Sequence, residues 1–185
     1  MAQSKYVQSV VKAARGRPRS TAWFRDKIAD FGKPGVMDLI RDGKRKSVPF
    51  YGRLNMFVYD PKHKKTLPYY DTFPLVLPIE KYPDGFLGCN LHYLPIPLRI
   101  KLLDRLVDFS NNTKFDESTV LAVDYSSLKN INLVKPTLKR YLAGHVKTQF
   151  RRIDADEFTV ATLLPVQRFR KSSDSAVWGD SRRML

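Results

Sequence analysis

Hydrophobic positions in the first 31 residues recur at helical spacing. Tyr6, Val7, Val10 and Val11 share one side of a helix that we expect over residues 4–14. Gly16 and Pro18 then interrupt the pattern. The same spacing predicts a second helix over 21–31, with Ser20 as its N-cap and Gly32 at its end. Both helices are too short to be stable alone, so each is expected to pack on another part of the protein.

From Gly52 onward the period changes from helical to alternating. Short alternating runs separated by turn residues predict three strands, over 53–59, 73–79 and 86–94, with turns at 60–65 and 82–85. The second strand contains Pro74 and Pro78, which have no backbone donor. It is therefore expected to lie at a sheet edge or to bend.

The second half of the chain alternates between the two periods. The pattern predicts helices over 97–109 and 136–150, strands over 119–125 and 156–164, and a polar tail with an isolated Trp178. The expected fold class is α+β, with a small, strongly curved antiparallel sheet or partial barrel on which helices pack. We divide the chain into a basic helical arm (1–50), an α+β core domain (51–167) and a polar basic tail (168–185).

Composition supports a folded core and narrows the class of protein. Hydrophobic residues make up 43% of the 185 residues, with 11 Phe and 9 Tyr, which is enough to bury a core. No run approaches the roughly 18 apolar residues that a membrane span needs, and the first residues have no apolar signal-peptide region. A single cysteine, Cys89, excludes a disulfide framework and a cysteine-rich zinc site.

The positive charge is uneven along the chain. The formal net charge is +15, and residues 1–50 carry +8 of it, with 12 Lys and Arg against 4 Asp. Two groups interrupted by glycine or proline dominate this region: Arg15, Arg17 and Arg19, and then Arg41, Lys44, Arg45 and Lys46. Basic loops of this kind suit the DNA phosphate backbone, because each contact releases condensed counterions. A solvated surface, an acidic membrane surface or an acidic protein partner would suit the same charge.

Two further basic groups lie in the predicted core domain. Lys62, Lys64 and Lys65 occupy the 60–65 turn. Arg140, Lys147 and Arg151 are spaced i, i+7 and i+11, which places them on one side of the predicted 136–150 helix, with Leu138, Tyr141, Leu142 and His145 on another. Such a helix could lie along a phosphate backbone. An ordinary solvated helix face is the alternative.

Aromatic residues are dense along the predicted sheet: Phe50, Tyr51, Phe57, Tyr59, Tyr69, Tyr70, Phe73, Tyr82, Phe86 and Tyr93. Most of them are expected to form core. Any that are exposed beside the 60–65 turn are suited to stack on unpaired bases at a frayed DNA end.

The sequence has little that indicates catalysis. It contains neither a glycine-rich phosphate loop nor a nucleophile elbow, and its three histidines lack metal-ligand spacing. Asp60, Asp71, Glu80 and Asp84, with Lys81, are the only candidates for a metal-dependent nuclease cluster, but Asp60 and Asp84 sit beside Pro or Gly as turn residues do. We therefore expect no catalytic residue, metal, cofactor or small-molecule substrate, and Cys89 is expected to be a buried apolar residue.

Two segments resemble a known family. They are GRLNMFVYDPKHKKTLPYYDTFPLVLPIEKYPDGFLGCNLHYLP (52–95) and RRIDADEFTVATLLPVQRF (151–169). Together they are similar to virion proteins of T-even-like contractile-tailed phages and their cyanophage relatives, in particular the DNA end protector or head-completion proteins. The resemblance covers about two-thirds of the chain from Gly52 onward and leaves out the basic first 50 residues.

This resemblance implies a non-enzymatic protein, synthesised in the host cytoplasm and located in the virion, that binds the end of packaged double-stranded DNA. It would shield that end from host exonuclease and act where head meets tail, in contact with other phage structural proteins. A structural role in the tail, neck or baseplate fits the same segments. There the basic arm would tether the protein to neighbouring subunits.

Overall fold

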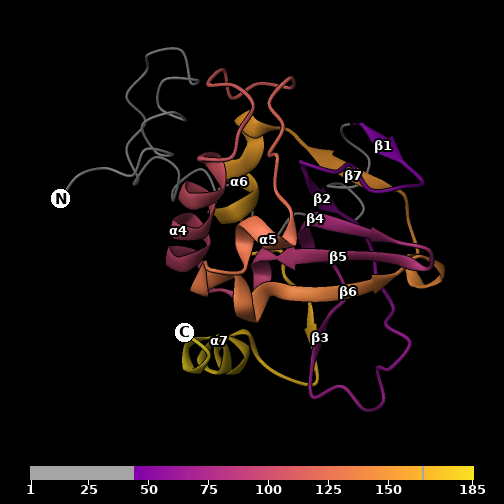
Figure 1. The fold of residues 1–185 in the computed structure, drawn as a ribbon. Coiled ribbons are helices and arrows are strands. Elements are labelled where there is room, and N and C mark those ends of the chain that lie inside the picture. Colours follow the sequence, from indigo (N-terminus) through magenta and orange to yellow (C-terminus); the bar gives the residue numbers. More distant parts are fainter. Residues whose placement is uncertain (1–43, 164) are drawn as a thin grey trace.

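The fold combines one large antiparallel sheet with a few helices, which confirms the mixed class expected from the pattern (Figure 1). The computed structural model describes residues 44–163 and 165–185. The helices expected over 4–14 and 21–31, and the cationic residues Arg15, Arg17, Arg19 and Arg41, lie outside the described residues.

Six strands in the order β1-β7-β2-β4-β5-β6 make up the large sheet, and every neighbouring pair is antiparallel. The strands are β1 (Arg45–Lys46), β2 (Leu54–Met56), β4 (Leu75–Tyr82), β5 (Gly85–Asn90), β6 (Leu138–Leu142) and β7 (Phe150–Ile153). Because β1 and β6 are its two edges, the sheet is open and does not close into a barrel.

β4 lies in the middle of the sheet, so its expected place at an edge was wrong. The expected bend is present, because the register with β5 shifts between Pro78 and Glu80. A two-residue turn then joins β4 to β5, where Tyr82 pairs with Gly85, as the turn residues predicted. A Cβ atom at Gly85 would lie 1.9 Å from the Tyr141 carbonyl oxygen, so only glycine fits this close approach of β6.

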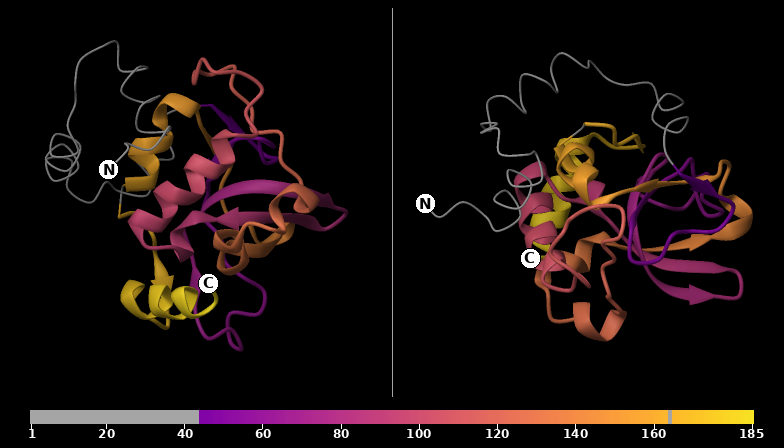
Figure 2. Two further views of the ribbon diagram at one scale, coloured as in Figure 1. Left: turned by 60° about the vertical axis from the view of Figure 1, so that its left-hand side comes forward. Right: turned by 90° about the horizontal axis from the view of Figure 1, so that it is seen from above.

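The two faces of the sheet bury different residues. Side chains alternate along β4, and Leu75 and Leu77 belong to an aliphatic core whereas Val76 belongs to an aromatic one. The helices α4 (Ile96–Val107) and α6 (Phe158–Leu163) pack against each other and contribute to the aliphatic core (Figures 1 and 2). Pro97 stands in the first turn of α4, which confirms the helix expected there.

The aromatic core lies around Phe57 on the opposite face. Its ring centroid is 4.7 Å from that of Phe150 and 5.4 Å from that of Tyr141. Phe86 stacks on Tyr141 at 5.2 Å. Aromatic residues of the predicted sheet therefore include true core residues, as expected for most of them.

The helix expected over 136–150 was wrong. A 3-10 helix (Asn132–Thr137) containing Pro136 leads into β6, a further 3-10 turn (Ala143–His145) follows, and β7 begins at Phe150. β6 supplies the backbone partners that the outer edge of β5 needs, and this long-range pairing overrides the helical spacing of the side chains. Arg140, Lys147 and Arg151 therefore do not share a helix face.

Two expected strands were also wrong. In place of the strand expected over 156–164, a 3-10 turn (Ala155–Glu157) leads into α6, because Asp154 and Glu157 make a capping box that starts a helix. Residues 119–125 form one isolated bridge, between Leu121 and Ser110, before the short helix α5 (Tyr125–Leu128) that Asp124 caps.

The strands expected over 53–59 and 86–94 are shorter than expected. β2 ends at Met56, and Tyr59 makes an isolated bridge to Val146. β5 ends at Asn90, whose side chain caps a 3-10 helix (Leu91–Tyr93). β2 and β5 therefore both end at the point where the chain leaves the large sheet.

Residues near the C-terminus form regular structure. β8 (Phe169–Arg170) pairs with β3 (Tyr70–Asp71), and α7 (Asp174–Arg183) begins at the N-cap Ser173. Trp178 of α7 donates a hydrogen bond from its indole nitrogen to the His92 carbonyl oxygen at 2.9 Å. This helix therefore packs on the segment after β5.

Candidate nucleic-acid interface

The described part of the chain is itself strongly basic. Residues 44–185 hold 24 Lys and Arg against 14 Asp and Glu, a net charge of +10. A polyanion-binding surface can therefore lie on the folded part of the protein as well as on the first residues.

The turn after Asp60 presents exposed cations. Lys62, His63, Lys64 and Lys65 are all exposed, and the turn is closed by a hydrogen bond from the Lys64 backbone nitrogen to the Pro61 carbonyl oxygen at 3.2 Å. Lys64 contacts Asp60 at 2.9 Å, and this hydrogen bond lowers the pKa of the Asp60 carboxyl. Lys62 and Lys65 therefore project from a turn in which one lysine is already paired.

Two lysines from distant segments join this turn. The backbone of Lys147 donates a hydrogen bond to Val58 at 2.9 Å, and the charge of Lys147 helps to lower the pKa of Asp60. Lys171 donates from its ammonium to the carbonyl oxygens of Lys65 and Leu67 at 2.8 and 3.0 Å. We call the five residues Lys62, Lys64, Lys65, Lys147 and Lys171 the lysine cluster.

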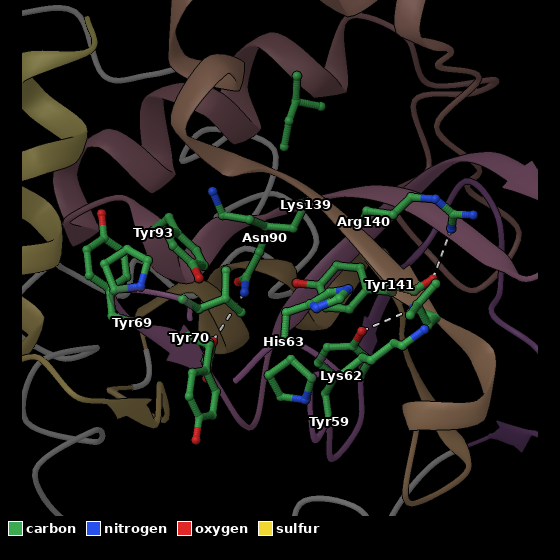
Figure 3. Close-up of a pocket in the computed structure, with 16 residues that line it drawn as sticks. Tyr59, Lys62, His63, Tyr69, Tyr70, Asn90, Tyr93, Lys139, Arg140 and Tyr141 are labelled. Carbon is green, nitrogen blue, oxygen red and sulfur yellow. Dashed lines mark hydrogen bonds between the residues drawn. The ribbon is translucent and has the colours of Figure 1, made fainter. Parts of the chain in front are cut away.

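A pocket of about 500 Å³ lies beside the lysine cluster, between the 60–70 segment and β6 (Figure 3). Five tyrosines line it together with four basic side chains of the turn and β6: Tyr59, Tyr69, Tyr70, Tyr93, Tyr141, Lys62, His63, Lys139 and Arg140. Single-stranded nucleic-acid sites combine the same two groups, aromatic rings that stack on bases and cations that contact the phosphate backbone.

Lys139 is a residue that the sequence analysis missed. Its ammonium nitrogen lies 4.1 Å from the centre of the Tyr93 ring and donates to the Pro136 carbonyl oxygen at 2.9 Å. Burial lowers the pKa of Lys139 to about 8. Residues 138–142 do not alternate between apolar and polar, so no local signal in the sequence places Lys139 in the sheet.

Asp71 and Asn90 form the buried end of the pocket. The Asp71 carboxylate accepts hydrogen bonds from the backbone nitrogens of Phe73 and Arg168 at 2.9 and 3.1 Å and from the Asn90 amide at 3.3 Å. Its Oδ2 atom lies 2.7 Å from Nδ1 of the buried His92. A fixed negative charge therefore sits at the inner end, whereas Lys62 and His63 are at the exposed end.

Arg140 contributes less to the pocket than its neighbour. Its guanidinium forms an ion pair with Asp84 and lies 4.2 Å from the centre of the Tyr82 ring. Figure 3 shows this side chain turned away from Tyr93 and His63. Arg140 is therefore held at the β4–β5 turn.

The cations at the β1 end of the sheet are largely matched by carboxylates. Lys44 contacts Glu117 at 2.5 Å and Arg151 contacts Glu157 at 3.0 Å, and the Arg151 side chain is mostly buried. Arg45 and Lys46 are exposed on the edge strand β1. The structure thus brings Lys62, Lys64, Lys65 and Lys147 together, whereas Lys44, Arg45, Lys46, Arg140 and Arg151 lie elsewhere.

The carboxylates considered for a nuclease cluster are each engaged separately. Asp60 pairs with Lys64, Asp84 with Arg140 and Asp71 with His92, and Glu80 accepts a hydrogen bond from the Tyr82 hydroxyl. Within residues 44–163 and 165–185, no group of three or more His, Cys, Asp or Glu could hold a metal ion.

Two further expectations concern single features. Cys89 is fully buried in β5, as expected, and burial raises the pKa of its thiol to about 12. Among the described helices, none has the length and apolar character to cross a membrane.

Comparison with known proteins gives one match. A family model described as "Phage T4 terminal DNA protecting protein" matches residues 3–180. The match includes the basic first 50 residues, which the sequence resemblance had left out. Neither the curated proteins nor the solved structures contain a match to this chain.

Proposed function

The chain belongs to the family of phage T4 terminal DNA protecting proteins, and we propose that it binds the ends of double-stranded phage DNA through the phosphate backbone. The bound protein would deny exonucleases access to the end, without itself catalysing a reaction on the DNA. Its place would be the virion, at the completed head or the head–tail junction.

The lysine cluster is the observation that carries the DNA contact. Three segments far apart in the sequence bring exposed ammonium groups to one place, and Lys62, Lys65 and Lys147 have no carboxylate partner among the ion pairs of the described residues. Phosphate contacts position a protein on DNA without reading its sequence. Binding is therefore expected to show little sequence preference.

Arg15, Arg17, Arg19 and Arg41 add four further cations that we assign to the same role. Together with the lysine cluster and the exposed Arg45 and Lys46, they are enough for about six to eight phosphate contacts. That number would give a slope of log K against log salt of about −5 to −7.

The test is a salt-dependent gel shift that compares linear with closed-circular duplex DNA of the same sequence, followed by digestion of the linear complex with an exonuclease. We expect tighter binding to the linear form and protection of its ends. Equal binding to both forms, with no protection, would show a general DNA-packaging role in place of end protection.

A second function, attachment to a neighbouring virion protein, is favoured by a separate observation. Val48, Tyr51 and Tyr82 are 59%, 39% and 38% exposed and line a hollow of about 780 Å³ at the β4–β5 turn. Exposed apolar residues gathered in this way mark protein contacts. Co-assembly with a virion protein that Tyr51→Ser abolishes, without DNA affinity at 150 mM salt, would support this function over the first.

A further inference from the structure

We propose that the pocket between the 60–70 segment and β6 holds the terminal nucleotide of a DNA strand, with its base among the tyrosines and its phosphate at the lysines. This rests on the proposed end-binding function and names the part of the end that is recognised. It would make the protein specific for ends.

Size and lining agree with a nucleotide. The volume of about 500 Å³ lies within the range of about 300–1,000 Å³ that small-molecule sites occupy. Tyr69 and Tyr70 are half-buried, so part of each ring is accessible, whereas Tyr59, Tyr93 and Tyr141 are buried and form a fixed wall. In Figure 3 the His63 ring stands among these tyrosines. A base entering this space meets aromatic surface on several sides.

The charge distribution gives the nucleotide a direction. The buried Asp71 carboxylate and the Asn90 amide lie at the inner end, where the carboxylate repels a phosphate and both groups offer polar atoms to a base edge. Lys62 and His63 are exposed at the outer end, and the ammonium of Lys139 lies over the Tyr93 ring in the wall of the pocket. The base therefore points inward and the phosphate outward.

Only an end can supply such a base easily. Within a duplex every base is paired and stacked on both sides, and extruding it costs the energy of both interactions. A terminal base has one stacking neighbour and a pair that frays. The lysine cluster beside the pocket would at the same time hold the backbone of the adjoining duplex.

The experiment uses photo-crosslinking with the full-length wild-type protein. A blunt duplex carries 5-iododeoxyuridine either at the terminal position or eight base pairs inward, and crosslinked peptides are identified by mass spectrometry. We expect crosslinks from the terminal position to Tyr69, Tyr70 or His63, and few from the inner position. Equal crosslinking from both positions, or crosslinks only outside the pocket, would overturn the inference.

Variants give an independent measurement. His63→Ala with Tyr70→Ala is expected to weaken binding to linear DNA about tenfold and to leave binding to closed-circular DNA unchanged, because the circle has no terminal base. Tyr70→Phe should retain the affinity, since the ring remains. Tyr125→Ala removes an exposed tyrosine of α5, which does not line the pocket, and is the matched control.

The outcomes separate the two proposals. If the wild-type protein binds linear DNA but the double variant loses affinity for both DNA forms equally, the pocket assignment fails and end binding stands. If the wild-type protein shows no binding to linear DNA, the proposed function fails and the pocket assignment fails with it.

Discussion

The ammonium nitrogen of Lys139 lies 4.1 Å from the centre of the Tyr93 ring, inside a pocket that also contains Tyr69 and His63. A lysine in this position is partly withdrawn from water, which lowers its pKa to about 8. A charge that is lost near physiological pH therefore sits where we place a nucleotide.

Binding to DNA ends is expected to depend on pH through Lys139. Below pH 8 the amine is protonated and attracts phosphate, and above pH 8 it is increasingly neutral. Affinity should fall as pH rises from 7 to 9, by up to about tenfold per pH unit above 8, because binding then requires uptake of one proton. Fluorescence anisotropy at constant ionic strength measures the affinity at each pH. Lys139→Arg keeps its charge and should give a flatter profile, and an unchanged profile in this variant would exclude Lys139 as the source.

Removing three lysines of the cluster is expected to reduce the salt dependence of DNA binding. In Lys62→Ala/Lys65→Ala/Lys147→Ala, the slope of log K against log salt should become shallower by about 2.7, since each phosphate contact contributes about 0.9. The weakening should be the same for all DNA sequences. Lys101→Ala/Lys114→Ala/Lys129→Ala removes three exposed lysines outside the cluster and is the matched control. Equal slopes in the two triple variants would contradict a specific role for the cluster.

Acidification is expected to destabilise the fold through His92. Burial lowers the pKa of His92, despite the nearby Asp71, and Nε2 of His92 is buried without a hydrogen-bond partner. The ring is therefore neutral and donates from Nδ1 to Asp71. Since the unfolded chain binds this proton more readily, stability is fully present above pH 6.5 and is lost as pH falls below it. Urea unfolding between pH 7.5 and 5 measures the loss, which His92→Gln should reduce. Equal losses of stability in the wild type and the variant would exclude His92 as the cause of the acid destabilisation.

Asp71 is expected to be essential for stability. Burial opposes its ionisation, but the hydrogen bonds from His92 and from the backbone nitrogens of Phe73 and Arg168 outweigh burial and lower its pKa. Asp71→Ala would leave these buried donors unpaired and should lower the free energy of unfolding by about 3–5 kcal/mol. Urea unfolding of the wild type and the variant at pH 7 measures this difference in the free energy of unfolding. A loss below about 1 kcal/mol would show that water satisfies the donors.

Glycine is expected to be required at position 85 and not at position 144. Gly85→Ala would place a Cβ atom 1.9 Å from the Tyr141 carbonyl oxygen, whereas a Cβ atom at Gly144 meets nothing within 4 Å. Separating β5 from β6 should cost roughly 1–3 kcal/mol, and Gly144→Ala should change stability by about 0.5 kcal/mol or less. Thermal unfolding of the two variants compares them directly. Similar melting temperatures would contradict the close approach.

Local patterns were sufficient where one short segment holds the whole signal. The β4–β5 turn follows from Pro83-Asp84-Gly85, and α4 follows from Pro97 and the spacing of Leu102, Leu103 and Leu106. Local patterns failed where a segment pairs with a strand that is distant in the sequence. Residues 138–142 have helical spacing but pair with β5 more than 45 positions earlier. The strand expected over 156–164 is wrong for a different reason, because the capping box of Asp154 and Glu157 is a local signal that outweighs the alternation.

The candidate site was predictable only in part for the same reason. The cationic turn at Lys62, Lys64 and Lys65 is visible in the sequence, but the arrival of Lys147 and Lys171 beside it depends on contacts across 80 to 110 residues. Whether a cation is paired, as Arg151 is by Glu157, is likewise invisible in a linear pattern.

The sequence by itself determined the mixed α/β class, the excess of positive charge and the family resemblance, because composition and short-range spacing are properties of neighbouring residues. Tertiary structure alone decided which lysines gather, which carboxylates neutralise their neighbours, and that five tyrosines enclose a pocket beside Lys139. These depend on strand order and long-range pairing, which follow from the free energy of the whole fold and not from any local segment.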